Sequence, residues 1–211
     1  MAPYWTVPHE WPGETVFIVA GGPSVLGQDL GSLRGRRVIA INSSVFTVPW
    51  ADALFFGDWR WWNERENQAA VASFSGRVVT TSRTVPDRKV HVCCKTKPPG
   101  LALERNSLMQ RWTSLTAATN LAAHLVGPGG SIVWLGADGQ KAADGRTHHH
   151  TPHRWAHTPG CYDKHLGDLV TIVPSLKALG IAAYNASPGT AWADLVPVID
   201  LQEALAERRA A

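Results

Sequence analysis

A glycine-rich turn directly after an apolar run is the first feature of this sequence that could do chemistry. Residues 15–20 read Thr-Val-Phe-Ile-Val-Ala and are followed by Gly21, Gly22, Pro23 and Ser24. The run favours a strand, glycines allow close backbone approach and positive φ, and Pro-Ser favours a helix start whose N–H groups attract anions. The turn predicts a nucleotide-phosphate site, and the alternative is a purely structural turn. It lacks the GxGxxG spacing of a dinucleotide-binding fingerprint and the GK[ST] ending of a Walker loop, so neither of those two kinds of site is indicated.

A histidine-rich loop is the second concentration of reactive side chains. Five of the nine histidines lie close together, and they are His148, His149, His150, His153 and His157. One imidazole could act as a general acid or base near neutral pH. On a helix, His153 and His157 would share one face and could hold a metal ion, although no third ligand follows at a recognised spacing and no HExxH glutamate is present. A solvated loop without a role is the third interpretation.

Polar side chains also follow several apolar runs. Asn42 follows Arg-Val-Ile-Ala-Ile, Asp58 follows Ala-Leu-Phe-Phe-Gly, and Asp138 follows Ser-Ile-Val-Trp-Leu-Gly-Ala. Each alone could be a turn or capping residue. Because the carboxyl ends of parallel strands share the edge where ligands bind, we expect these residues and the glycine turn to form one site.

Tryptophan is abundant, with ten residues, and three of them are nearly consecutive. Trp59, Trp61 and Trp62 come directly after a predicted strand. Aromatic side chains bury large areas in any core, which is the ordinary explanation. The alternative is a stacking platform for a base or a sugar.

Strand and helix patterns alternate along the chain. Strands are predicted at 15–19, 37–42, 53–56, 78–81, 90–94, 131–135 and 181–185, and helices at 25–34, 60–74, from Ser114 to the glycines at 127–130, at about 162–179 and after Asp200. Residues 95–111 and 139–160 are expected to be loops. The alternation predicts an α/β fold, a Rossmann-like three-layer sandwich with a mostly parallel sheet, in a single domain 1–211 with a core at about 15–200.

Composition narrows the class of protein. With 211 residues and 45% hydrophobic content, one compact domain is expected, and a net charge of +3 does not by itself indicate nucleic-acid binding. No apolar run reaches the roughly 18 residues of a membrane span, and no signal-peptide pattern opens the sequence. The three cysteines form no disulfide pattern, so we expect a cytoplasmic protein.

The motifs also suggest a family. In chain order they are Gly21-Gly22-Pro23-Ser24, Asn42, Asp58, Thr113-Ser114, Gly136-Ala137-Asp138, His153-x-x-x-His157 and Asn185-x-Ser187-Pro188. This order resembles the bacterial sialyltransferases of glycosyltransferase family 42. It is also similar to the related MptE-like proteins, which include a hydroxymethylpterin diphosphokinase and small phage and bacterial members.

The resemblance implies a Rossmann-like sheet of the glycosyltransferase-A variant that binds a nucleotide-linked donor, CMP-sialic acid in sialyltransferases, without needing a metal. It implies that Asp138 holds the ribose or base and that His157 is the general base. The residues assigned to the donor nucleotide by motif and resemblance together are Gly21, Gly22, Pro23, Ser24, Asn42, Asp58, Trp59, Thr113, Ser114 and Asp138. Those assigned to catalysis are His153 and His157, and none is assigned to a metal.

Three functions remain open at this stage. The first is a glycosyltransferase that moves a sugar from a nucleotide to an acceptor hydroxyl on a saccharide, a small molecule or a modified DNA base. The second is a diphosphotransferase acting on a hydroxymethyl pterin, in which Asp58 and Asp138 would hold Mg²⁺. The third is a nucleotide-binding module without catalysis.

Overall fold

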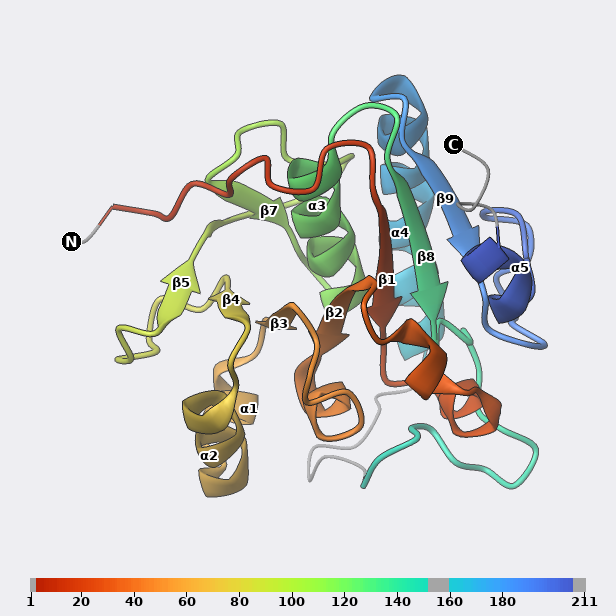
Figure 1. The fold of residues 1–211 in the computed structure, drawn as a ribbon, viewed down its shortest axis with the longest axis horizontal. Helices are drawn as coiled ribbons and strands as arrows, with labels where there is room; N and C mark the ends of the chain where they lie inside the picture. Colours follow the sequence, from red (N-terminus) through yellow and green to blue (C-terminus); the bar gives the residue numbers. More distant parts are fainter. Residues whose placement is uncertain (1–2, 152–159, 207–211) are drawn as a thin grey trace.

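The computed structural model describes residues 3–151 and 160–206, and its centre is a sheet of seven parallel strands (Figure 1). Across the sheet, the strands stand in the order β5, β4, β3, β2, β1, β8, β9. Their bounds are β1 Thr15–Val19, β2 Arg37–Ile41, β3 Ala53–Phe56, β4 Arg77–Thr80, β5 Val90–Val92, β8 Ser131–Leu135 and β9 Ala182–Asn185. The predicted α/β class and parallel sheet are confirmed.

The central strand β1 shows why these residues form a sheet that is covered on both sides. Val16 and Ile18 face one side, and Phe17 and Val19 face the other, and all four are buried. Because both faces of the strand are covered, it needs a continuous apolar run rather than an alternating one. The same reasoning applies to β2, β3 and β8, whose interiors are also buried.

Helices on both faces complete three layers. The longest two, α3 (Ser114–Val126) and α4 (Cys161–Ala178), pack on the face that holds Val16 and Ile18. Shorter elements cover the other face, namely η1 Pro23–Gly27, η2 Leu30–Leu33, η3 Asn42–Phe46, α1 Trp59–Trp62, α2 Arg65–Ser73 and α5 Leu201–Ala206. None of these helices, in the part of the chain that is described, has the length and apolar character needed to cross a membrane.

Two predicted helices are wrong in detail. Residues 25–34 form the two 3-10 helices η1 and η2 rather than one helix, because the side chain of Asp29 accepts from the N–H of Gly31 and starts a new turn. Residues 60–74 are divided into α1 and α2 at Asn63 and Glu64.

The segment 95–111, predicted as an irregular loop, contains two short strands. These are β6 (Cys94–Thr96) and β7 (Ser107–Met109), which pair in parallel and form a separate two-stranded sheet. The side-chain oxygen of Asn120, on α3, accepts from the N–H groups of Ala102 and Met109 at 2.8 and 3.0 Å. A buried side chain distant in sequence therefore orders this segment, and a local pattern could not reveal it.

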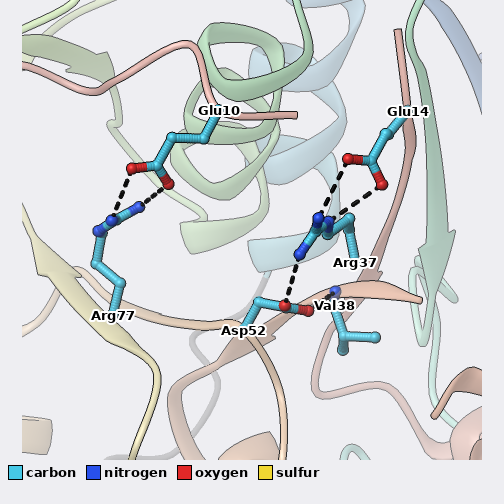
Figure 2. A network of polar contacts seen from close by, with 6 residues as sticks. All are labelled: Glu10, Glu14, Arg37, Val38, Asp52 and Arg77. Carbon is cyan, nitrogen blue, oxygen red and sulfur yellow. Dashed lines mark hydrogen bonds and ion pairs between the residues drawn. The ribbon is translucent and has the colours of Figure 1, made fainter. Parts of the chain in front are cut away.

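A polar network joins the N-terminal segment to the amino edge of the main sheet (Figure 2). Its members are Glu10, Glu14, Arg37, Val38, Asp52 and Arg77. Arg37 donates to both carboxylate oxygens of Glu14, at 3.1 and 3.3 Å, and also to Asp52. Arg77 donates to both oxygens of Glu10, at 2.6 and 2.9 Å. These guanidinium groups are thus satisfied by carboxylates of the chain itself.

The strand order creates a crevice at the carboxyl edge. The chain passes from β1 to β2 on one side, and β8 lies on the other side of β1. The loops that leave β1 and β8 therefore run in opposite directions and leave a crevice between them. In open α/β sheets, ligands bind in such a crevice at the carboxyl ends of the strands.

Candidate functional site

A cleft of about 860 Å³ opens at the carboxyl edge, around the ends of β1, β2, β3 and β8. Most of the residues predicted to bind a donor nucleotide line it, and they are Gly21, Gly22, Asn42, Asp58, Trp59, Thr113, Ser114 and Asp138. Pro23 and Ser24 do not line the cleft: Pro23 is buried, and Ser24 is hydrogen-bonded to Asp138. The fold therefore gathers segments that are far apart in sequence, as the strand-end pattern predicted.

The glycine turn differs from the expectation of positive φ. Gly22 has φ −65°, and Gly21 is also outside the positive region. The N–H of Gly22 donates to the carbonyl of Gly136 at 3.0 Å, and a Cβ at position 22 would lie 2.4 Å from that oxygen. Glycine is therefore needed at position 22 because the turns after β1 and β8 pack directly against each other.

Asp138 occupies the start of η1, where a phosphate was predicted. Its Oδ2 accepts from the N–H of Ser24 at 2.8 Å, and its Oδ1 accepts from the Ser24 hydroxyl. Burial raises the pKa of Asp138, while the two hydrogen bonds from Ser24 act in the opposite direction. The carboxylate thus links the turns after β1 and β8. This contact gives Ser24 a structural role in place of the predicted phosphate contact.

Asn42 combines an unusual backbone with an unsatisfied side chain. Among the described residues it is the one non-glycine residue with positive φ, at 51°. Its Oδ1 is buried and has no hydrogen-bond partner, and the residue lines the cleft. A backbone in the left-handed region costs about 1 kcal/mol or more, and a buried unpaired oxygen adds to that cost. Such a combination is typical of a residue that a ligand satisfies.

The tryptophans divide into core and surface residues. Trp61 and Trp62 are buried and pack on Phe56, with ring centroids 4.9 and 5.9 Å apart, so they form part of the core. Trp59 is 53% exposed and Trp112 is 52% exposed, and both line the cleft. Of Trp59, Trp61 and Trp62, therefore, only Trp59 has an exposed ring for stacking, and Trp112 offers a second exposed ring that the sequence analysis did not identify.

Cationic side chains surround the same cleft. Arg60 donates through Nε and Nη2 to Asp58, whose carboxylate also accepts from the N–H of Arg60 and so caps α1. Lys95, on β6, is exposed on the cleft wall. Arg111 contacts the buried carboxylate of Asp168 through Nε at 2.9 Å and through Nη2 at 2.6 Å. The wall therefore carries three cations, two of which are held in place by acids.

The helix α3 begins at this wall. The helix begins at Ser114 as predicted, and Thr113 caps it, since the Thr113 hydroxyl accepts from the N–H of Leu115 at 3.1 Å. Asp168 also accepts from the N–H of Trp112 at 2.9 Å and so fixes the segment that leads into α3. The positive end of the helix dipole and the cations together favour an anion in the cleft.

The histidine loop meets the glycine turn. The N–H of His149 donates to the carbonyl of Gly21 at 3.0 Å, and His148 and His150 line the cleft above that glycine. The ring of His149 turns the other way, to the hydroxyls of Ser44 and Thr47. Burial, with a smaller contribution from His150, lowers the pKa of His149 to about 4. Consecutive histidines thus face different environments, while His153 and His157 lie outside the described residues.

Metal binding has little support in the described residues. Within 3–151 and 160–206, no group of three or more His, Cys, Asp or Glu side chains is arranged to hold a metal ion. The two acids suggested for Mg²⁺ already accept hydrogen bonds, Asp58 from Arg60 and Asp138 from Ser24. The reading in which His153 and His157 hold a metal concerns residues that are not described.

Several cleft residues were missed by the sequence analysis, and they are Lys95, Gln110, Arg111, Trp112, Tyr162 and His165. The Arg111-Trp112 pair directly precedes the helix that starts at Ser114, which is a signal that could have been used. Gln110 had no local signal, because its place depends on Gly57, where a Cβ would collide with the Gln110 side chain. In comparisons with known proteins, no family model and no curated protein matches this chain.

Proposed function

We propose that the chain is a transferase that binds a nucleotide-linked donor in the carboxyl-edge cleft and passes its sugar to an acceptor hydroxyl. The observation that carries the proposal is Asn42, a residue that lines a cleft at the crossover point of a parallel sheet and whose side-chain oxygen is buried without a described hydrogen-bond partner. An amide oxygen accepts hydrogen bonds from amino or hydroxyl groups, which bases and riboses supply.

The remainder of the cleft supports binding of the other parts of a nucleotide. Trp59 and Trp112 offer exposed rings on which a base or a sugar can stack. Lys95, Arg111 and the start of α3 favour a phosphate. Aromatic and cationic groups in one cleft suit a molecule that has both an aromatic base and a charged phosphate.

The chemistry follows from what such a donor offers. The acceptor oxygen forms a bond to the anomeric carbon, the bond from that carbon to the phosphate oxygen breaks, and the acceptor proton passes to a histidine. The resemblance described above assigns the role of the proton-accepting base to His157. His150, which lines the cleft, is the other histidine to test for this role. The cations stabilise the leaving nucleotide phosphate.

The pterin diphosphotransferase is less favoured. It requires Asp58 and Asp138 to hold Mg²⁺, whereas hydrogen bonds from Arg60 and Ser24 engage these carboxylates. A nucleotide-binding module without catalysis would share the cleft and differ only in turnover. The two alternatives are therefore separated from the proposal by Mg²⁺ dependence and by activity.

A thermal-shift screen with CMP, UDP, GDP and ATP, with and without Mg²⁺, tests nucleotide binding. A nucleotide at 100 times its Kd stabilises the native state by about 2.7 kcal/mol. We expect at least one nucleotide to raise the melting temperature without Mg²⁺. A rise that occurs with ATP and Mg²⁺ alone favours the diphosphotransferase, and no rise with any nucleotide contradicts the proposal.

Asn42→Gly tests the residue on which the proposal rests. Glycine adopts φ 51° without strain, so this variant removes the amide and keeps the backbone. We expect the melting temperature without nucleotide to be no lower than in the parent chain, because glycine removes the backbone strain, and the nucleotide-induced rise to be lost. Asn63→Gly, which makes the same chemical change at an exposed residue outside the cleft wall, should keep the rise. Equal nucleotide affinity in Asn42→Gly and the parent chain would exclude Asn42 as a ligand-binding residue.

A further inference from the structure

A second cavity, of about 210 Å³, lies at the amino edge of the sheet, between the end of α3 and the residues that precede β9. Its lining is mainly apolar and includes Ala102, Leu103, Ala123, Pro128, Leu179 and Ile181. Leu103 is 72% exposed, so its side chain lies at the open side of the lining. None of the described residues that line this cavity is acidic.

Most polar groups around this cavity already have partners. His9 Nε2 donates to the carbonyl of Val126 at 3.1 Å, and His124 Nε2 to that of Ser107 at 3.1 Å. Burial lowers the pKa of His124; the hydrogen bond to Ser107 acts in the opposite direction, and the nearby charge of Arg105 adds to the lowering. Both imidazoles therefore already hydrogen-bond to carbonyls of the chain itself.

Arg105 is the exception. Its Nε and Nη2 atoms are buried and have no hydrogen-bond partner among the residues that the structure describes. These two groups form the edge of a guanidinium that fits both oxygens of a carboxylate. Elsewhere in the molecule the same edge is occupied: Arg37 binds the two oxygens of Glu14 with it, and Arg111 binds Asp168. Arg105 lines the cavity, and none of the described acids is hydrogen-bonded to this edge of its guanidinium.

We propose that this cavity binds the carboxylate of a small aliphatic acid, with the Arg105 side chain turning its edge into the cavity so that Nε and Nη2 donate to the two oxygens. The apolar lining would cover the aliphatic body. A volume of about 210 Å³ is about seven times the share of one water molecule in the liquid, which suits an acid of about seven non-hydrogen atoms. The C-terminal end of α3 opposes an anion, so we expect a dissociation constant of about 1 mM rather than tight binding.

Titration of the full chain with pentanoate, followed by ¹⁵N NMR, tests the proposal directly. The side-chain Nε–H signal of Arg105 is assigned by its loss in Arg105→Lys, and the backbone signals of Leu103 and Gly127 report on the cavity lining. We expect a saturable shift of all three signals with pentanoate. Pentan-1-ol, which has a similar body and no charge, should produce no saturable shift.

The variant Arg105→Lys keeps the charge and removes the two-pronged edge. We expect the dissociation constant for pentanoate, read from the Leu103 and Gly127 signals, to rise at least tenfold. Arg88→Lys, an equivalent change at an exposed residue, should leave it unchanged.

Three outcomes would overturn the proposal. They are no saturable shift with pentanoate in the parent chain, an equal response to pentan-1-ol, and tighter binding of inorganic phosphate than of pentanoate. The titration of the parent chain decides the first two even if Arg105→Lys fails to fold. Because the cavity lies at the opposite edge from the cleft, these results do not depend on whether nucleotides bind.

Discussion

The two edges of the central sheet treat their polar side chains in different ways. At the amino edge, the guanidinium groups of Arg37 and Arg77 bind carboxylates of the chain itself, as Figure 2 shows. At the carboxyl edge, Asn42 has positive φ and a buried oxygen without a partner. The paired charges at the amino edge stabilise the fold. The strained backbone and unpaired oxygen of Asn42 lower the stability of the fold at a residue that lines a cleft.

This difference indicates where a ligand is expected. Paired groups need nothing further, so the ion pairs that involve Arg37 and Arg77 call for no ligand. The lack of a partner also identifies Arg105 at the amino edge. Its buried Nε and Nη2 atoms have no described hydrogen-bond partner, whereas Arg37 and Arg77 are paired with carboxylates. A buried polar group without a partner is thus a more selective guide than the number of charges, because the paired acids and bases outnumber such groups.

The largest expected effect concerns catalysis at the carboxyl edge. We expect His157→Ala to lower turnover by about 10² to 10⁴-fold and to leave donor binding nearly intact, as is typical for loss of a general base. Turnover would be measured with a sugar donor built on the nucleotide that the thermal-shift screen identifies.

A matched variant at the other edge makes this comparison sharper. His9→Ala removes an imidazole at the amino edge, where the ring donates to the carbonyl of Val126, and it should leave turnover unchanged. Full activity in His157→Ala would refute the assignment. A large loss confined to His150→Ala would transfer the role to the cleft-lining histidine.

The next largest effect is on stability, at the contact between the turns after β1 and β8. We expect Gly22→Val to lower the free energy of unfolding by about 3 kcal/mol, because its Cβ would lie 2.4 Å from the carbonyl oxygen of Gly136. Urea denaturation would measure the loss. Gly27→Val is the control, since no atom lies within 4 Å of a Cβ there, and an equal loss in both variants would contradict the packing argument.

Gly22 also shows how far the sequence could predict the site. The apolar runs 53–56 and 131–135 coincide with β3 and β8, because a strand covered on both faces needs a continuous apolar segment. Once the strands were placed, their ends put Asn42 and Asp138 at one edge. The role of Gly22 could not be predicted in this way, because its neighbour Gly136 is brought near only by the pairing of β1 with β8.

Other features depended on contacts too distant in sequence to leave a local pattern. The strands β6 and β7 are three residues each, and the side-chain amide of Asn120 holds both the segment between them, at Ala102, and the end of β7, at Met109. Arg111 is held by Asp168, 57 residues away. Neither short strand has a periodic pattern long enough to predict, so the loop predicted at 95–111 was wrong for a physical reason.

A smaller effect is expected from pH, through His149 at the carboxyl edge. Its pKa is about 4 in the folded chain, against 6.5 for an unperturbed histidine. The unfolded chain therefore binds a proton before the folded one does as the pH falls from 6.5 to 4, and the stability present above pH 6.5 is lost in that window. After allowance for partial exposure, we expect a loss of about 2 kcal/mol.

The pH effect is measured by urea denaturation at several pH values between 7.5 and 4. In His149→Gln, which keeps a polar side chain next to Ser44 and Thr47, the dependence on pH should be reduced by the same amount. An unchanged pH profile in His149→Gln would show that other groups cause the acid sensitivity.

The smallest effect is expected from the amino edge, although its ion pairs are the more conspicuous feature. Glu10 and Arg77 are 39% and 28% exposed, and Arg77 lowers the pKa of Glu10 mainly through its hydrogen bond. Exposed pairs contribute little because water and salt screen them, so Glu10→Gln should reduce the free energy of unfolding by about 0.5 kcal/mol. Because the folded pKa of Glu10 is lowered, this contribution is present above its unfolded pKa and decreases as the pH falls. Urea denaturation at low salt and at 1 M NaCl would measure the effect, which should vanish at the higher concentration. A loss comparable to that of Gly22→Val would mean that the paired edge, rather than the packing between turns, holds the sheet together.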